Sequence, residues 1–163
     1  MREFYISKKE TRSLVEEIKS KLKADLSEIK DKGNKVIELE KEVRFFVLEN
    51  LIFIREGENI FPALSCTKDF LERFPSVNVD KGAIPYICNG AKIMRPGIVG
   101  FEKDFKIDDI VLVKDSVHNK FIAVGKALIE KSEAEKSEKG AALENLHYIG
   151  DKHWKALKDY NLG

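Results

Sequence analysis

The sequence has few of the residues that hold small secreted proteins or metal centres together. Its 163 residues include two cysteines, Cys66 and Cys88, which form no CxxC pair and no Cys/His cluster. A disulfide framework and a structural zinc site are therefore not expected, and two isolated cysteines fit a reducing cytosol. We predict that the protein holds no metal and no other cofactor.

Long apolar runs are also missing. No stretch approaches the roughly 20 apolar residues that cross a bilayer, and the first ten residues, MREFYISKKE, lack the apolar core of a signal peptide. These absences predict a soluble, cytoplasmic protein with no membrane partner. The formal net charge of +1 argues against a DNA-coating protein, so DNA is not an expected partner. Any contact with nucleic acid has to come from a local patch.

Motifs that mark common enzymes are absent as well. The chain contains no GxxxxGK[ST] phosphate loop, no GxGxxG after a strand and no HExxH pair. Residues 97–100 have the GXXG spacing of a KH-type loop, but the central pair, Ile98 and Val99, is apolar and lies in a strand context. We therefore predict that the protein is not an enzyme.

The first part of the chain predicts a compact α+β domain over residues 1–75. Ser7 and Glu10 form a capping box, and an apolar stripe follows that predicts a helix ending at Gly33. The stripe consists of Leu14, Ile18, Leu22, Leu26 and Ile29. Four segments rich in β-branched and aromatic residues predict strands over 35–41, 43–50, 51–56 and 59–64. A short helix capped by Thr67 then ends at Pro75.

The second part, residues 76–163, predicts a mostly-β domain with a C-terminal helix. Asp80 caps a short helix that ends at Asn89-Gly90, and short strands follow up to residue 148. The polar segment 132–140 is interpreted as a solvated loop. Several short strands around one small helix are typical of a closed or nearly closed barrel.

One stretch of this second part has an unusual charge pattern. No Asp or Glu occurs from Lys81 to Phe101, although 35% of all residues are charged, and the stretch carries three cations, Lys81, Lys92 and Arg95. Its glycines would let a phosphodiester approach the backbone, and its cations would offset phosphate charge. Composition alone supports chance equally well as an explanation of the missing carboxylates.

The order of motifs in this part resembles the PUA domain, which is named for pseudouridine synthases and archaeosine transglycosylases. The blocks that match in order are Asp80, Gly82-Ala83, Asn89-Gly90-Ala91, Pro96-Gly97-Ile98, Asp109-Ile110-Val111 and Ala123-Val124-Gly125. They cover about residues 77–150. Asp108 stands where the pattern usually has glycine. The resemblance implies a PUA pseudo-barrel for residues 76–163, behind a pre-PUA α+β domain.

The complete arrangement looks like a narrower family, the malignant-T-cell-amplified-sequence proteins and their archaeal relatives. This resemblance implies a non-enzymatic, RNA-binding protein that handles tRNA on the small ribosomal subunit during initiation or recycling. The RNA would be a tRNA 3′ end or small-subunit rRNA, and a separate partner would supply a SUI1-type domain. Alternatives are a ribosome-assembly factor, an accessory subunit of an RNA-modifying enzyme, and a protein adaptor that works through the N-terminal sheet.

PUA domains bind RNA along the short helix, the next strand and the Pro-Gly turn. Carried over by position, the resemblance implies an RNA-binding face made of Lys81, Gly82, Asn89, Gly90, Ala91, Lys92, Met94, Arg95, Pro96 and Gly97. Arg95 precedes Pro96, which favours an extended backbone there. We expect its side chain to point out of the turn and grip a phosphate, so Arg95→Glu should leave the fold nearly unchanged.

Overall fold

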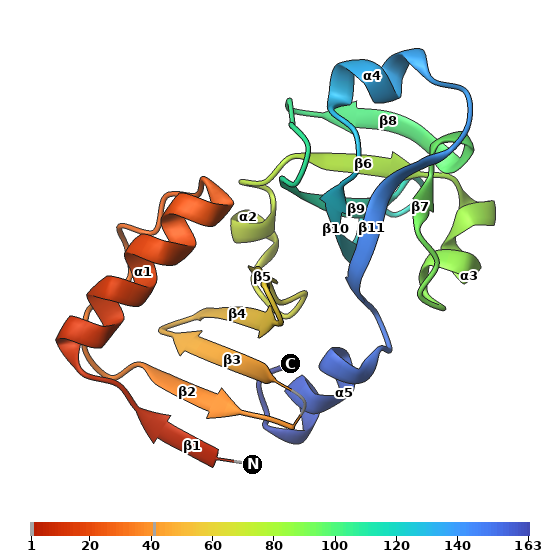
Figure 1. Ribbon diagram of the computed structural model, residues 1–163. Coiled ribbons are helices and arrows are strands. Elements are labelled where there is room, and N and C mark those ends of the chain that lie inside the picture. The colour runs from red at the N-terminus through yellow and green to blue at the C-terminus, as the bar shows by residue number, and fades with distance from the viewer. Residues whose placement is uncertain (1, 41) are drawn as a thin grey trace. The chain divides into compact units, whose positions relative to one another are not determined.

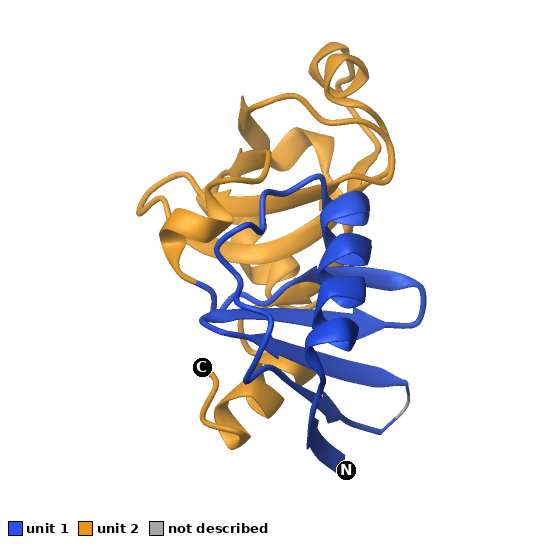
Figure 2. Ribbon diagram, turned by 90° about the vertical axis from the view of Figure 1, so that its left-hand side faces the viewer, with its two compact units in different colours: residues 1–66 blue, residues 67–163 orange. Residues whose placement is uncertain are grey.

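Residues 2–40 and 42–163 are described by a computed structural model, in which the chain divides into two units, Met1–Cys66 and Thr67–Gly163 (Figure 2). The first is an α+β unit and the second a curled, mixed β-sheet with short helices, so the predicted fold class is confirmed (Figure 1). No helix among the described residues is long and apolar enough to cross a membrane.

The first unit is an antiparallel five-stranded sheet with one helix. The strands β1 (Arg2–Tyr5), β2 (Lys35–Glu38), β3 (Val43–Leu48), β4 (Leu51–Glu56) and β5 (Asn59–Pro62) lie side by side in chain order. Alternate residues of the strands face the core, where Phe45, Phe53 and Phe61 are fully buried. The sequence predicted the last four strands and missed β1.

Helix α1 (Lys8–Leu22) begins as predicted and ends eleven residues before Gly33. At its start, the Ser7 side chain accepts a hydrogen bond from Glu10 N, and the Glu10 side chain accepts one from Ser7 N, both at 3.0 Å. The predicted end is wrong, because Lys23 adopts a left-handed conformation with φ of 53°. Leu26 is still buried, in the irregular segment beyond the helix, so the apolar stripe predicted burial correctly and helix length incorrectly.

The second unit contains six strands and several short helices. Its strands are β6 (Ser76–Val79), β7 (Ile93–Met94), β8 (Ile98–Glu102), β9 (Ile110–Asp115), β10 (Phe121–Ala127) and β11 (Ala141–Tyr148). Its helices are α2 (Lys68–Leu71), α3 (Ile84–Ile87), α4 (Lys131–Lys136) and α5 (Lys152–Asp159), with 3₁₀ turns η1 (Lys81–Ala83) and η2 (Arg95–Gly97). The sheet order is β7-β11-β10-β9-β6-β8, and only the β6–β9 pair is parallel among the described strands.

This order explains why the sheet curls. The edge strands β7 and β8 follow one another in the chain and are joined by the three residues of η2, so the two edges must come close together. The curled sheet encloses an apolar core to which Val77, Ile93 and Val111 contribute, each fully buried. The predicted pseudo-barrel is thus a curled sheet whose edge strands β7 and β8 are joined through η2, although these two described strands are not paired with each other; we call this junction the closure of the sheet.

Two details differ from the sequence prediction or extend it. The first part of the segment interpreted as a solvated loop, up to Lys136, lies in α4, and Ala134 in it is fully buried. Residues before Ser76 are tied to the second unit, because Lys103 Nζ donates to the Glu72 carbonyl at 2.8 Å and Leu112 N donates to the Pro75 carbonyl at 2.9 Å. The domain boundary between residues 75 and 76 stays a prediction.

Candidate nucleic-acid interface

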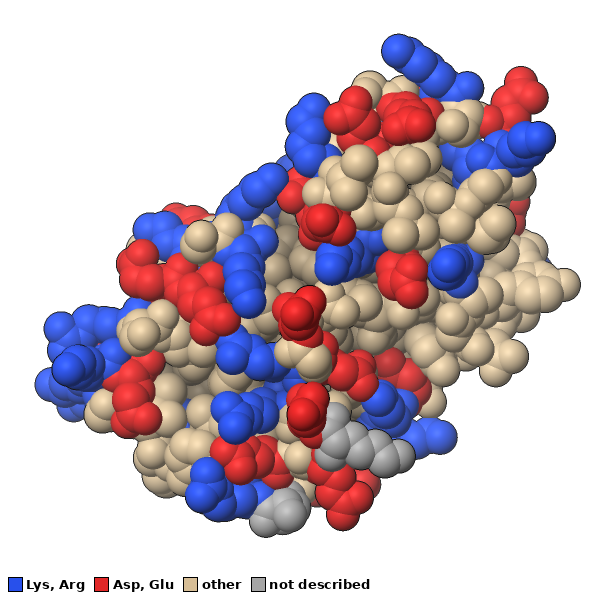
Figure 3. Space-filling model, viewed as in Figure 1, with Lys and Arg blue, Asp and Glu red and all other residues tan. Residues whose placement is uncertain are grey.

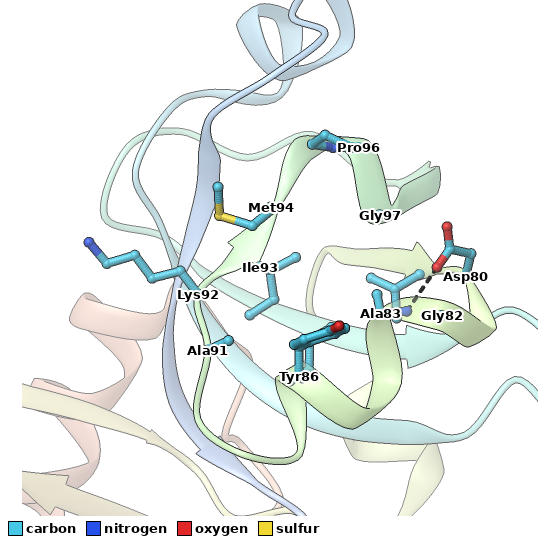
Figure 4. A pocket seen from close by; sticks show the side chains of 12 residues that line it. Asp80, Gly82, Ala83, Tyr86, Ala91, Lys92, Ile93, Met94, Pro96 and Gly97 are labelled. Carbon is cyan, nitrogen blue, oxygen red and sulfur yellow. Dashed lines mark hydrogen bonds between the residues drawn. The ribbon is translucent and has the colours of Figure 1, made fainter.

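An open pocket of about 460 Å³ lies beside α3, between this helix, β7 and the turns η1 and η2 (Figure 4). We call it the α3 groove. Its lining residues are Val79, Asp80, Gly82, Ala83, Tyr86, Ile87, Ala91, Lys92, Ile93, Met94, Pro96 and Gly97. Ile87 and Ile93 in the lining are buried, whereas Tyr86 is 71% exposed and Met94 47% exposed. The groove therefore has an apolar floor and carries a large aromatic and a thioether side chain at its surface.

The short helical segment beside the groove is fixed by a cap at its start and a glycine after its end. Asp80 Oδ1 accepts a hydrogen bond from Ala83 N at 2.9 Å, which starts η1 (Figure 4). Gly90 has φ of +94°, a conformation that side-chain-bearing residues rarely adopt, and it turns the chain towards β7. Both features were predicted from the sequence.

Asn145 in β11 holds the turn between α3 and β7 from the other side. Its Nδ2 donates to the carbonyls of Ile87, at 3.0 Å, and Ala91, at 2.9 Å. One side chain thus fixes both ends of the turn that carries Asn89 and Gly90. The sequence analysis did not identify this residue, because the contact joins positions more than fifty residues apart.

The turn η2 packs directly on η1. The Gly97 carbonyl accepts a hydrogen bond from Asp80 N at 2.9 Å, and a Cβ placed on Gly97 would come within 3.0 Å of Ala83 Cβ. This approach is tighter than most real Cβ contacts, so a side chain at position 97 would require the two turns to separate by a few tenths of an ångström. Packing of the two turns therefore favours a glycine at position 97, independently of any ligand.

Arg95 does not point out of the turn, so that expectation is wrong. Its Nε donates to the Ala134 carbonyl at 2.6 Å, and its Nη1 donates to the Ile98 carbonyl at 2.9 Å. The guanidinium carbon also lies 5.2 Å from the centre of the Phe101 ring. Tertiary contacts thus override the local preference before proline: the side chain joins α4 to β8 at the place where the sheet closes. Arg95 is a support of the turn.

Few charges surround the α3 groove. The Lys92 side chain points away from the groove in Figure 4. Its Nζ lies 4.0 Å from Glu144 Oε2, and both side chains are about half exposed. Such a surface ion pair contributes about 0–1 kcal/mol, so it can be exchanged for another anion. Lys81 is exposed at the start of η1, and the Asp80 carboxylate is engaged by the cap. In Figure 3, the right-hand part of the visible face, where α3 lies in Figure 1, is mostly uncharged.

The structure brings six of the ten predicted residues into one pocket. These are Gly82, Ala91, Lys92, Met94, Pro96 and Gly97. Asn89 and Gly90 lie on the adjoining turn, Lys81 lines a neighbouring cavity, and Arg95 begins η2 with its side chain bound to the carbonyls of Ala134 and Ile98. The sequence analysis missed Tyr86, because it followed charge and glycine. The signal was present: with Ile84 and Ile87 facing inward, helical spacing directs Tyr86 to solvent.

Cys66, His147 and Asp151 lie outside the groove. Cys66 is buried in the first unit, where burial raises the pKa of its thiol to about 11. His147 is fully buried, and its Nδ1 lies 2.9 Å from Asp151 Oδ2. Among residues 2–40 and 42–163, no group of three or more His, Cys, Asp or Glu side chains could hold a metal ion.

Comparison with known proteins places this chain in a family. The model of the PUA domain matches residues 75–149. An uncharacterized protein of Methanocaldococcus jannaschii is 34% identical over 155 residues, which cover 93% of this chain and 94% of the relative. Translation machinery-associated protein 20 of Schizosaccharomyces pombe is 30% identical over 144 residues, 83% of this chain and 80% of the relative.

A further relative and two solved structures are also similar to this chain. Malignant T-cell-amplified sequence 1 of Rattus norvegicus is 32% identical over 108 residues, 64% of this chain and 59% of the relative. The crystal structure of a hypothetical protein from Pyrococcus horikoshii matches with a TM-score of 0.79 and 26% identity over 95% of this chain and 99% of that one. A conserved PUA domain protein from Thermoplasma acidophilum matches over the same shares with a TM-score of 0.73 and 27% identity. The chain therefore belongs to the family of PUA-domain proteins that includes Translation machinery-associated protein 20 and the malignant T-cell-amplified sequence proteins.

Proposed function

We propose that this protein is a non-enzymatic, cytoplasmic RNA-binding protein that acts in translation and holds a single-stranded RNA end in the α3 groove. The observation that carries the proposal is the groove itself, an apolar pocket of about 460 Å³ with the exposed Tyr86 on its surface. Unpaired bases bind such surfaces by stacking on aromatic side chains, which is worth about 1–3 kcal/mol per base. The family names support the link to translation.

The proposed contact surface keeps the predicted residues and adds one. Tyr86 and Met94 would contact bases, and Lys81 and Lys92 would contact phosphates. Gly82, Asn89, Gly90, Ala91, Pro96 and Gly97 would give the strand access to the backbone, and Arg95 would support the turn without touching RNA. With two lysines in contact, the slope of log K against log salt should be about −1.4, from roughly −0.7 per phosphate of a single strand.

The finer role that we propose is handling of tRNA at the small ribosomal subunit, in initiation or recycling. The RNA would be the 3′ end of a tRNA or a single-stranded segment of small-subunit rRNA. A separate protein with a SUI1-type domain would act as the partner. A free RNA end fits the groove better than a duplex does, because bases in a duplex are stacked on one another and cannot reach Tyr86.

A pair of tyrosine variants tests the proposal. Tyr86→Ala should weaken binding of a short single-stranded RNA at least tenfold, or about 1.4 kcal/mol, because a stacking surface is lost. Tyr5→Ala is the matched control, since Tyr5 is 74% exposed on β1 in the other unit. Fluorescence anisotropy at several salt concentrations measures both. Equal binding by the two variants would contradict the proposed site.

Sedimentation of the tagged protein from cell extract tests the finer role. We expect it to travel with small ribosomal subunits, and to leave them when Tyr86 is replaced. Migration with assembling particles or with an RNA-modifying enzyme would instead support one of the alternatives raised by the sequence.

A further inference from the structure

A second cavity, of about 420 Å³, lies on the opposite side of η1 and α3. We call it the Val117 cavity. Lys81, Ile84 and Pro85 line it from the helical segment, and Asp115, Val117, His118 and Ile122 line it from the β9–β10 hairpin. Residues 82, 83, 86 and 87 of the same segment line the α3 groove. The helical segment is therefore a ridge between two pockets, and residue 81 lies next in sequence to two lining residues of the groove.

The loop that carries Val117 is held rigidly. The Asp115 carboxylate accepts hydrogen bonds from the backbone N–H groups of Val117, at 3.0 Å, of His118, and of Lys120, at 3.1 Å. Ser116 N donates to the Val79 carbonyl at 3.0 Å and ties the loop to β6. Despite this order, the Val117 side chain is 62% exposed. The fold thus presents an apolar side chain at a fixed position where it buries little surface.

The charges around the Val117 cavity favour a polyanion. Asp115 contributes the carboxylate of the lining, but it is only 4% exposed and is engaged by three backbone N–H groups. The polar groups that reach solvent in the lining are the Lys81 ammonium and the His118 imidazole, both on exposed residues. Phosphate is attracted by the first and can accept a hydrogen bond from the second.

We propose that the Val117 cavity is a second nucleotide subsite. A single strand whose end occupies the α3 groove would cross the ridge at Lys81 and place a further base against Val117 and Pro85. Its phosphate would lie at Lys81 and His118. This inference rests on the proposed function, because it extends the same strand. The path over Lys81 favours RNA over a peptide, because a polynucleotide carries a phosphate at every step along its backbone, whereas a peptide backbone carries no charge.

The test uses single-stranded oligonucleotides that increase in length from dinucleotide to octanucleotide. Wild-type protein should bind the longer oligonucleotides about tenfold more tightly than the shortest. Val117→Asp should bind the shortest oligonucleotides as tightly as wild type does. It should lose most of the increase in affinity with oligonucleotide length (the gain with length), because a carboxylate then faces the second base and its phosphate. Ser116→Asp is the matched control: the same charge is added at the neighbouring exposed position, outside the cavity lining. It should keep most of the gain.

The outcomes separate the two proposals. If wild-type protein binds none of the oligonucleotides, the proposed function fails. If wild-type protein binds but Val117→Asp and Ser116→Asp lose the same part of the gain with length, or neither loses any, the second subsite is refuted while the first stands. Circular dichroism and thermal melting of both variants show that they fold. Both substitutions are at exposed positions, so we expect melting temperatures close to that of the wild type.

Discussion

Replacing Arg95 with leucine should destabilise the second unit by about 2–4 kcal/mol. The variant keeps an apolar side chain but loses the hydrogen bonds to the carbonyls of Ala134 and Ile98. Hydrogen bonds from a charged donor contribute about 1.5–3 kcal/mol each, and the contact with the Phe101 ring adds about 0.5–1 kcal/mol. Together these contributions come to about 3.5–7 kcal/mol, and we expect the smaller loss of about 2–4 kcal/mol, because Arg95 is only half-buried and water can reach the freed groups.

A second fact limits the loss. The Ala134 carbonyl also accepts a hydrogen bond from Ser137 N at 3.2 Å, so it keeps a partner when the guanidinium is removed. Arg95→Lys should lose at least half as much stability as Arg95→Leu, because one ammonium group cannot reproduce the planar fork that reaches two carbonyls at once.

Urea unfolding followed by circular dichroism measures these differences. Lys92→Leu is the control from the same segment, because Lys92 forms a long surface ion pair with Glu144, and it should change stability by less than about 1 kcal/mol. A loss below about 0.5 kcal/mol for Arg95→Leu, combined with a tenfold loss of RNA affinity, would refute the reasoning. Arg95 would then be a phosphate ligand, as its charge alone suggests.

Three other substitutions or treatments have defined outcomes. Gly97→Val should cost about 1–3 kcal/mol in urea unfolding, since its Cβ would press against Ala83 at 3.0 Å; an unchanged midpoint would show that the two turns separate easily. Burial alone raises the pKa of Asp151, but hydrogen bonds from His147, Trp154 and Tyr148 outweigh it and hold the pKa below its ordinary value. The stability that this lowered pKa provides is fully present above about pH 4 and is lost progressively as the pH falls further, so Asp151→Asn should differ in stability from wild type at pH 7, and the difference should shrink as the pH is lowered below 4. Iodoacetamide at pH 8 should modify Cys88 slowly and leave the buried Cys66 unmodified until urea is added, as mass spectrometry of the peptides would reveal.

Local interactions made most of the fold predictable. The capping box at Ser7, the caps at Thr67 and Asp80, and the glycine turn at Gly90 each depend on residues only a few positions apart. Alternating apolar residues predicted the strands for the same reason, because the residues on the buried face of a strand recur at every second position.

The errors arise where distant segments meet. A left-handed Lys23 ended α1 although the apolar stripe continued, and Leu26 is buried without a helix. The segment 131–136 is highly polar, yet it folds as α4 with Ala134 buried and with its carbonyl bound to Arg95, thirty-nine positions away. Neither contact leaves a periodic signal in the sequence. The candidate site was predicted only in part. Its glycines and lysines follow a local sequence pattern, whereas the hydrogen bonds from Asn145 to the carbonyls of Ile87 and Ala91 join distant positions.

The absence of carboxylates between Lys81 and Phe101 has a structural explanation that does not require RNA. A carboxylate near η2 would compete with the Ala134 and Ile98 carbonyls for the Arg95 guanidinium, at the point where the sheet closes. A carboxylate at position 97 would also add a Cβ where η1 and η2 touch.

These packing reasons do not extend to the exposed positions of the stretch. The side chains of Tyr86 and Met94 are exposed, so packing does not prevent a charged side chain at either position. Glu144 makes the same point from β11, since it lies beside Lys92 at the surface without disturbing the fold. The uncharged surface of the α3 groove is thus the part of the pattern that folding leaves unexplained and that binding of unpaired bases would explain.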